Sequence, residues 1–399
     1  MNKIRKAIPQ IVFVLITSLL CMTYITDKVV QYQIIIFSLL LFLYLWLSKL
    51  TIPRRYIQIY GVMVVFSVLY FLRAFIDLEV LGVKQTLFGN DYTVFVFLFF
   101  GAILQFVMIP RIRLSEKNFS WAFFLASIMI LGSLIISFSS ITSGNVVMTG
   151  DGRIQAGERL GVIEYGHLGL TSVIMGVVML MKRKESKLFL IISPLLLTFG
   201  LFSIIMAGTR SAMVGLFLIL MLFFSTRLNI KSLILSIAVI VLLYVVFSNL
   251  LVYTESIGAN SAVRMLRFLS EGGDQSSGRL EIWNKAIDEI LASPLLGVSC
   301  FISFAKYNVD YVHNSFIEVA YSLGLVGFIL FLIINIFAIS STFKIFKQKN
   351  VDYMCFAMLY IQYFVYTLFS ESIVRLPEYW YFLAMVICIG FNYLPANKK

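Results

Sequence analysis

Apolar runs long enough to cross a lipid bilayer recur along almost the whole chain, and they limit its possible folds more than any other feature. Hydrophobic residues make up 60% of the 399 residues, whereas charged residues make up 13%. A run of roughly 17–25 apolar residues spans the hydrocarbon core as a helix, which satisfies every backbone polar group internally. The sequence therefore predicts an all-α polytopic membrane protein.

The runs predict about twelve transmembrane helices in three parts of the chain. Residues 1–251 hold nine spans and an outer loop at 141–165, residues 252–314 form a large outer loop, and residues 315–399 hold three spans. The predicted spans are about 9–26, 30–48, 56–74, 92–110, 119–140, 166–181, 188–206, 209–226, 232–251, 315–341, 353–370 and 378–395.

Lysine and arginine are distributed unevenly between the two sides of this arrangement. One side holds 20 of the 32 basic residues and three of the 20 acidic residues, so the other holds 12 basic and 17 acidic residues. Because basic loops stay in the cytoplasm, we expect cytoplasmic termini and an outer face that carries 141–165 and 252–314. The net charge of +12 then indicates orientation and contact with anionic membrane lipids, and no nucleic-acid partner.

The large outer loop contains one segment with helical periodicity. Its polar positions include Glu281 and Lys285, and its apolar positions recur at helical spacing: Leu280, Trp283, Ile287 and Ile290. This pattern predicts an amphipathic helix that lies against the membrane domain or on its surface and ends at Ser293-Pro294. Arg279 falls in its first turn, where the helix dipole disfavours a cation.

Two further outer residues are candidates for chemistry. Arg210 follows a tight turn at Gly208-Thr209 between two spans, where an arginine either snorkels to the interface or binds an anion. His313 precedes the span at 315, as an interfacial residue or a general base. His167 is expected to be interfacial. One base and two cationic groups, Arg210 and Arg279, suit attack by a hydroxyl on a carbon that bears a phosphate leaving group.

Three motifs resemble the O-antigen ligase and O-antigen polymerase superfamily of bacterial envelope glycosyltransferases, mainly over residues 160–340. They are His313-Asn314 followed after nine residues by Gly324-x-x-Gly327, the turn Gly208-Thr209-Arg210-Ser211, and the loop segment Ser277-Gly278-Arg279 with Trp283. The resemblance implies a GT-C-like membrane fold in the bacterial inner membrane.

The resemblance also implies an activity. It is a metal-independent, inverting transfer of a glycan from an undecaprenyl diphosphate-linked oligosaccharide to an acceptor hydroxyl, without a cofactor. His313 deprotonates or orients the acceptor, and Arg210 and Arg279 neutralise the departing diphosphate. Further substrate contacts are expected from three residues: Arg153, Arg159 and Asn314.

The sequence leaves the acceptor open. The segment from His313 to Glu318 favours a polysaccharide polymerase, whose acceptor is a second lipid-linked repeat unit and whose partners include a chain-length regulator protein. The alternatives are an O-antigen ligase, which transfers the glycan to lipid A–core, and a ligase that acts on a protein hydroxyl. A polysaccharide-lipid flippase is a different class, but it requires charges along a central cavity and a two-half repeat, and the sequence has neither.

The predicted topology can be tested by cysteine labelling. A cysteine introduced near Asp274 should react with an impermeant thiol reagent in intact spheroplasts, because residues 252–314 are expected outside. A cysteine near Lys347 should react only after permeabilisation, because that loop is basic and short. The reverse pattern would put His313 on the wrong face for a periplasmic substrate.

Overall fold

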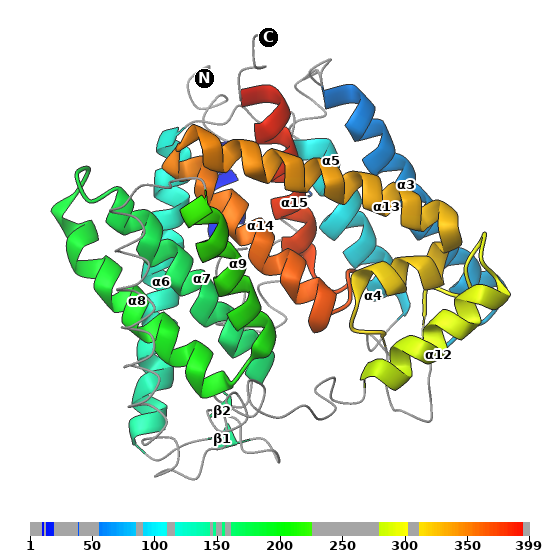
Figure 1. The fold of residues 1–399 in the computed structure, drawn as a ribbon, viewed down its shortest axis with the longest axis horizontal. Helices are drawn as coiled ribbons and strands as arrows, with labels where there is room; N and C mark the ends of the chain where they lie inside the picture. The colour runs from blue at the N-terminus through cyan, green and yellow to red at the C-terminus, as the bar shows by residue number, and fades with distance from the viewer. Residues whose placement is uncertain are drawn as a thin grey trace.

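The computed structural model describes residues 10–11, 13–19, 39, 56–84, 91–109, 116–143, 147–148, 154–155, 161–225, 279–301 and 311–393. These residues form a helical bundle (Figure 1), with one short antiparallel pairing of β1 (Val147–Met148) and β2 (Ile154–Gln155). Half of the predicted span 9–26, nearly all of 30–48 and all of 232–251 lie outside the described residues.

Five described helices are long and apolar enough to cross a membrane, and they coincide with five predicted spans. This agreement confirms a helical membrane protein, whereas the number of twelve spans stays a prediction. The five are α3 (Ile57–Phe75) continued by η2 (Ile76–Val80), α6 (Glu116–Thr142), α7 (Val162–Met181), α8 (Lys187–Ala207) and α13 (Ser315–Gln348).

The other described helices are shorter or less apolar. Predicted span 353–370 corresponds to α14 (Val351–Phe369), which carries Gln362 and four tyrosines. The predicted outer-loop helix is α12 (Arg279–Ala292). The rest are α4 (Asp91–Val96), η3 (Phe97–Ile103), α5 (Leu104–Met108), α9 (Arg210–Ser225), α15 (Pro377–Cys388) and η5 (Ile389–Tyr393).

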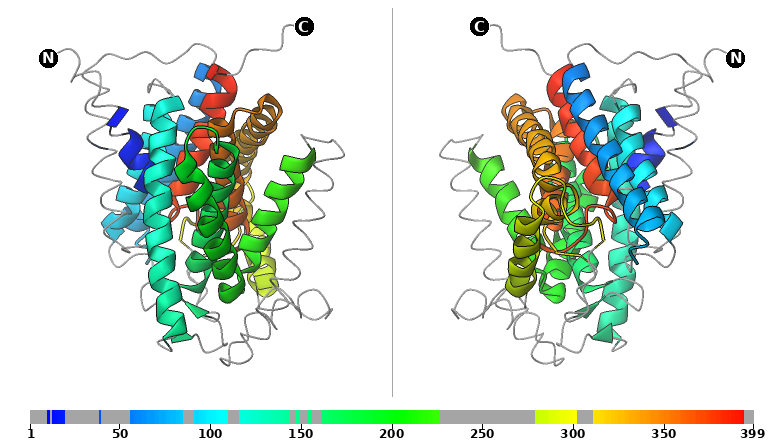
Figure 2. Two further views of the ribbon diagram at one scale, coloured as in Figure 1. Left: turned by 90° about the vertical axis from the view of Figure 1, so that its left-hand side faces the viewer. Right: turned by 90° about the vertical axis from the view of Figure 1, so that its right-hand side faces the viewer.

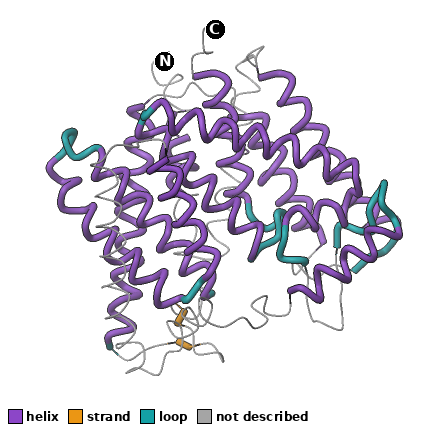
Figure 3. Tube along the Cα trace, viewed as in Figure 1, coloured by secondary structure: helices purple, strands orange, loops and turns teal. Residues whose placement is uncertain are grey.

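Helices α14 and α15 form the centre of the bundle. Every residue of α15 is buried, and it lies among the other helices in the two opposite side views (Figure 2). Helices α7 and α8 pack closely because glycines face each other: a Cβ added to Gly169 would lie 2.6 Å from the carbonyl oxygen of Gly200. The tube view shows that the described part of the chain is almost entirely helix (Figure 3).

The position of α12 shows which of its apolar residues meet the protein. The residues that pack against α13 and its neighbours are Ile282, Trp283, Ala286 and Ile290. Leu280 and Ile287, two apolar positions of the predicted helix, are 50% and 43% exposed. Both sides of α12 carry apolar residues, so the helical period alone did not determine which side meets the protein.

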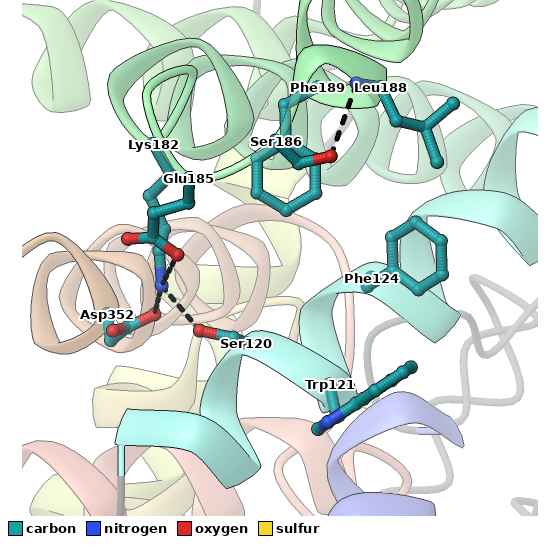
Figure 4. Close-up of a pocket in the computed structure, with 9 residues that line it drawn as sticks. All are labelled: Ser120, Trp121, Phe124, Lys182, Glu185, Ser186, Leu188, Phe189 and Asp352. Atoms are coloured by element: carbon teal, nitrogen blue, oxygen red, sulfur yellow. Dashed lines mark hydrogen bonds and ion pairs between the residues drawn. The ribbon is translucent and has the colours of Figure 1, made fainter.

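Opposite ends of the helices hold different polar groups. The α7–α8 connection and the start of α14 meet where the buried Lys182 ammonium contacts Asp352 at 2.8 Å and Ser120 (Figure 4). A pocket of about 530 Å³ lies beside this ion pair, with walls that include Trp121 and Phe189. The turn between α8 and α9, with Arg210, lies at the other end of α8.

The Lys182–Asp352 ion pair should make a large contribution to stability. Lys182→Met removes the ammonium that neutralises a carboxylate only 8% exposed, so it should cost about 3–5 kcal/mol. Thermal unfolding in detergent, followed by intrinsic fluorescence, measures the change. The control Lys184→Met alters an exposed lysine of the same connection and should cost less than about 0.5 kcal/mol. Equal stability of the two variants would contradict the assignment.

Candidate active site

The carbonyl groups at the end of α14 contact three side chains from two other parts of the chain. Arg279 of α12 donates a hydrogen bond to the carbonyl oxygen of Phe369. The Tyr311 hydroxyl donates to the carbonyl oxygen of Ser370 at 3.2 Å, and His313 Nδ1 lies 3.4 Å from the same oxygen. The sequence analysis predicted three catalytic residues. Two of them, Arg279 and His313, therefore lie at the same end of α14.

His313 has an unusual backbone conformation. Its φ of 55° lies in the left-handed region, which costs a non-glycine residue roughly 1–2 kcal/mol. Asn314 follows as the N-cap of α13, and its side chain accepts hydrogen bonds from the amides of Phe316 and Ile317. The strained residue is thus fixed between a capped helix and the Ser370 carbonyl.

The surroundings of His313 keep its imidazole neutral. Burial and the nearby Arg279 guanidinium lower the pKa of His313 to about 4, although the Ser370 carbonyl opposes this shift. Because a carbonyl oxygen only accepts hydrogen bonds, the proton of the neutral ring belongs on Nδ1. Nε2 is then the basic nitrogen, as a general base requires.

Two contacts fix α12 and so determine where Arg279 lies. Trp283 Nε1 donates to the carbonyl oxygen of Val312 at 2.7 Å, next to His313. The Tyr321 hydroxyl of α13 donates to Glu289 at 2.6 Å. The dipole of α12 disfavours Arg279 at its own first position, but the carbonyl end of α14 attracts a cation. The helix-end contact thus offsets an unfavourable local position.

Gly324 of the histidine motif joins α13 to the segment that follows α12. Its φ is 62°, and a Cβ there would lie 2.4 Å from the carbonyl oxygen of Leu295. The break in α13 leaves the Leu325 amide to donate to the carbonyl oxygen of Pro294 at 2.8 Å, and the Tyr321 carbonyl to accept from Val298 at 2.6 Å. The glycine therefore has a structural role.

Arg210 is followed by Ser211, which contacts the segment after α14. It is the first residue of α9, after Gly208 ends α8 in the left-handed conformation at φ 57°. Ser370 Oγ donates to Ser211 Oγ at 3.1 Å. The predicted turn between two helices is confirmed, and it places the start of α9 against the segment that contacts His313.

The prediction of an interfacial His167 is wrong. The side chain is fully buried in α7, stacks on Tyr366 with ring centroids 4.0 Å apart and has Nε2 3.0 Å from Ser211 Oγ. Its position in the sequence, one turn into an apolar helix, did not reveal which neighbours that helix would have.

The segment between α14 and α15 supplies residues that the sequence analysis missed. Arg375 Nε lies 3.8 Å from the Glu371 carboxylate, and burial raises the pKa of Glu371 to about 7 against the opposing effect of Arg375. Glu318 is buried and accepts hydrogen bonds from Ser372 Oγ and the Ile373 amide, so it fixes this segment. The sequence did offer one signal: Ser370, Ser372 and Arg375 lie close to Glu371 in a short segment between two apolar runs.

Some predicted contacts have no structural test. Arg153 and Arg159 lie outside the described residues, and Asn314 is observed only as a helix cap. Within the described ranges, no group of three or more His, Cys, Asp or Glu residues is arranged to hold a metal ion. The chemistry that the described site offers is one neutral base beside arginine cations.

The comparisons with known proteins agree with the motif analysis. Residues 194–332 match the model of the O-antigen ligase family, a range that contains Arg210, Arg279 and His313. This match confirms the superfamily resemblance and supports glycosyltransferase-type activity on lipid-linked glycans. No curated protein matches the chain.

The effect of Arg279 on His313 can be measured directly. Diethyl pyrocarbonate modifies neutral imidazole, so modification of His313 should change little between about pH 5 and 7 while the pKa is about 4. Arg279→Ala removes a contribution that lowers this pKa, so the pKa should rise and modification near pH 5 should slow. Peptide mass spectrometry follows the reaction. Arg279→Lys keeps the charge and serves as control; identical profiles for Arg279→Ala and the parent would contradict the assignment.

Proposed function

We propose that this chain, which matches the O-antigen ligase family over residues 194–332, transfers a glycan from undecaprenyl diphosphate to an acceptor sugar hydroxyl on the periplasmic face of the bacterial inner membrane. The observation that carries the proposal is the meeting of Arg279 and neutral His313 at the end of α14. A base and a cation lie together there, as displacement of a diphosphate requires.

The proposed reaction is a direct displacement. His313 Nε2 accepts the proton of the acceptor hydroxyl while its oxygen forms a bond to the anomeric carbon. The bond from that carbon to the diphosphate oxygen breaks, and its electron pair leaves with the diphosphate. Attack from the opposite face inverts the anomeric configuration, in a step that needs no metal because arginines neutralise the leaving group.

Arg279 and Arg210 are the proposed anion-binding residues. Guanidinium groups bind phosphate oxygens in a bidentate manner and keep their charge at all accessible pH values. Arg279 is held at the site by α12, and Arg210 begins α9 beside Ser211 and Ser370. Arg153 and Arg159 of the first outer loop would extend these contacts toward the glycan.

We propose polymerisation as the reaction, with a second lipid-linked repeat unit as acceptor and a chain-length regulator as partner. Glu318, part of the sequence argument for a polymerase, accepts hydrogen bonds that fix the α14–α15 segment, so it gives no independent support. Transfer to lipid A–core remains the alternative, and the products distinguish the two. A ladder of chain lengths from the lipid-linked repeat unit alone supports polymerisation, whereas product that requires lipid A–core indicates a ligase.

The roles of base and cation should separate in purified protein. Arg279→Ala should weaken binding of undecaprenyl diphosphate and reduce turnover about 100- to 1,000-fold, because one lost donor costs about 2.7–4 kcal/mol. His313→Gln should reduce turnover similarly but leave that binding unchanged. Arg183→Ala, an exposed arginine of the α7–α8 connection, is the matched control. Full transfer by both the Arg279→Ala and His313→Gln variants would refute the proposal.

A further inference from the structure

A polar cluster between α14 and α15 lies next to the proposed base and has no role in the reaction described so far. The Tyr311 ring centroid is 4.3 Å from that of His313. Tyr311 interacts electrostatically with Glu371 and Arg375, whose side chains lie 3.8 Å apart. The cluster of Tyr311, Glu371 and Arg375 therefore contacts the imidazole through the Tyr311 ring.

The charges around this cluster differ from those around His313. Among the described groups, the charged residue that shifts the pKa of His313 is Arg279. Tyr311 instead interacts with Glu371, Arg375 and Glu164. His313 is thus influenced by an arginine suited to a departing anion, whereas Tyr311 is influenced by a second group of side chains in which carboxylates outnumber guanidinium groups.

This balance of charge argues against a second diphosphate-binding arginine. Glu371 and Glu164 both raise the pKa of Arg375, and together with Tyr311 and Tyr366 they outweigh the opposing effect of burial. A guanidinium already paired with the Glu371 side chain at 3.8 Å gains less from a further anion. Sugar hydroxyls, in contrast, donate to a carboxylate and accept from a guanidinium at the same time.

The accessible parts of the cluster also suit a sugar. The Arg375 side chain is 41% exposed, whereas Glu371 is 10% exposed, so the pair reaches the surface mainly through the Arg375 guanidinium. The half-buried Tyr311 ring offers an apolar surface for the C–H face of a pyranose. Its hydroxyl is held by the Ser370 carbonyl at 3.2 Å, which orients the ring beside His313.

We propose that Tyr311, Glu371 and Arg375 form the acceptor subsite, which binds a neutral sugar and presents its hydroxyl to His313. This inference rests on the proposed glycosyl transfer and assigns the acceptor to one side of the base. The leaving diphosphate then belongs with Arg279 on the other, so that the incoming and departing oxygens meet different side chains.

The test separates acceptor binding from donor binding. The acceptor probe is the phosphate-free oligosaccharide released by mild acid from the lipid-linked repeat unit, and the donor probe is undecaprenyl diphosphate alone. Arg375→Ala and Glu371→Gln should raise KM for the acceptor about tenfold to a hundredfold, the usual effect of a lost hydrogen bond to a charged group. Both variants should bind undecaprenyl diphosphate within twofold of the parent, whereas Arg279→Ala should show the reverse pattern.

Controls make each outcome decisive. Arg183→Ala and Glu281→Gln change exposed residues of the same types and should alter neither constant. Arg375→Lys covers the case in which Arg375→Ala fails to fold, and it should restore acceptor KM only in part. Weaker undecaprenyl diphosphate binding by Arg375→Ala, unchanged acceptor KM, or preference for a phosphorylated oligosaccharide would each overturn the subsite. If the parent protein itself fails to bind undecaprenyl diphosphate, the proposed function fails instead.

Discussion

The carbonyl groups at the end of α14 are the constraint around which this site is built. The last carbonyls of a helix have no partner within it, and they need hydrogen-bond donors from elsewhere when the end is covered by protein. Here the donors come from Arg279, Tyr311 and His313. The residues that satisfy the helix end are thereby gathered in one place. One backbone requirement brings together parts of the chain that lie about 60–90 residues apart in sequence.

The described segment 279–301, which contains α12, is held to neighbouring helices near its C-terminal end. Asp77 of η2 accepts hydrogen bonds from the Cys300 amide at 2.6 Å and from Ser299, and its own ion pair with Arg73 measures 3.0 Å. Near the same end, Gly324 permits the backbone of Leu295 to approach α13. Helix α12 therefore has little freedom, and Arg279 is positioned by a rigid support, as an anion-binding residue requires.

The sequence revealed residues whose chemistry conflicts with their local setting. An arginine in the first turn of a helix, a histidine before a span and a glycine turn beside Arg210 were recognisable without a structure. Helical periodicity could not determine the orientation of α12, because Ile282 packs inward while Leu280 and Ile287 also form an apolar side. His167 was misassigned for a similar reason, since its contact with Tyr366 depends on the packing of distant helices. The Glu371–Arg375 pair was missed because the seven residues that connect α14 and α15, 370–376, are too short a segment to show a period.

The match to the O-antigen ligase family covers only part of the proposed site, and this bears on specificity for the acceptor. Residues 194–332 include the proposed base and both proposed diphosphate-binding arginines, together with Tyr311 of the proposed acceptor subsite. Glu371 and Arg375 lie beyond that range, and Glu164 precedes it. If the acceptor is bound there, the displacement is carried by the matched middle of the chain, while the choice of acceptor also depends on the segment between α14 and α15 outside it. Such a division would let one displacement chemistry serve different acceptors through changes in a single connecting segment.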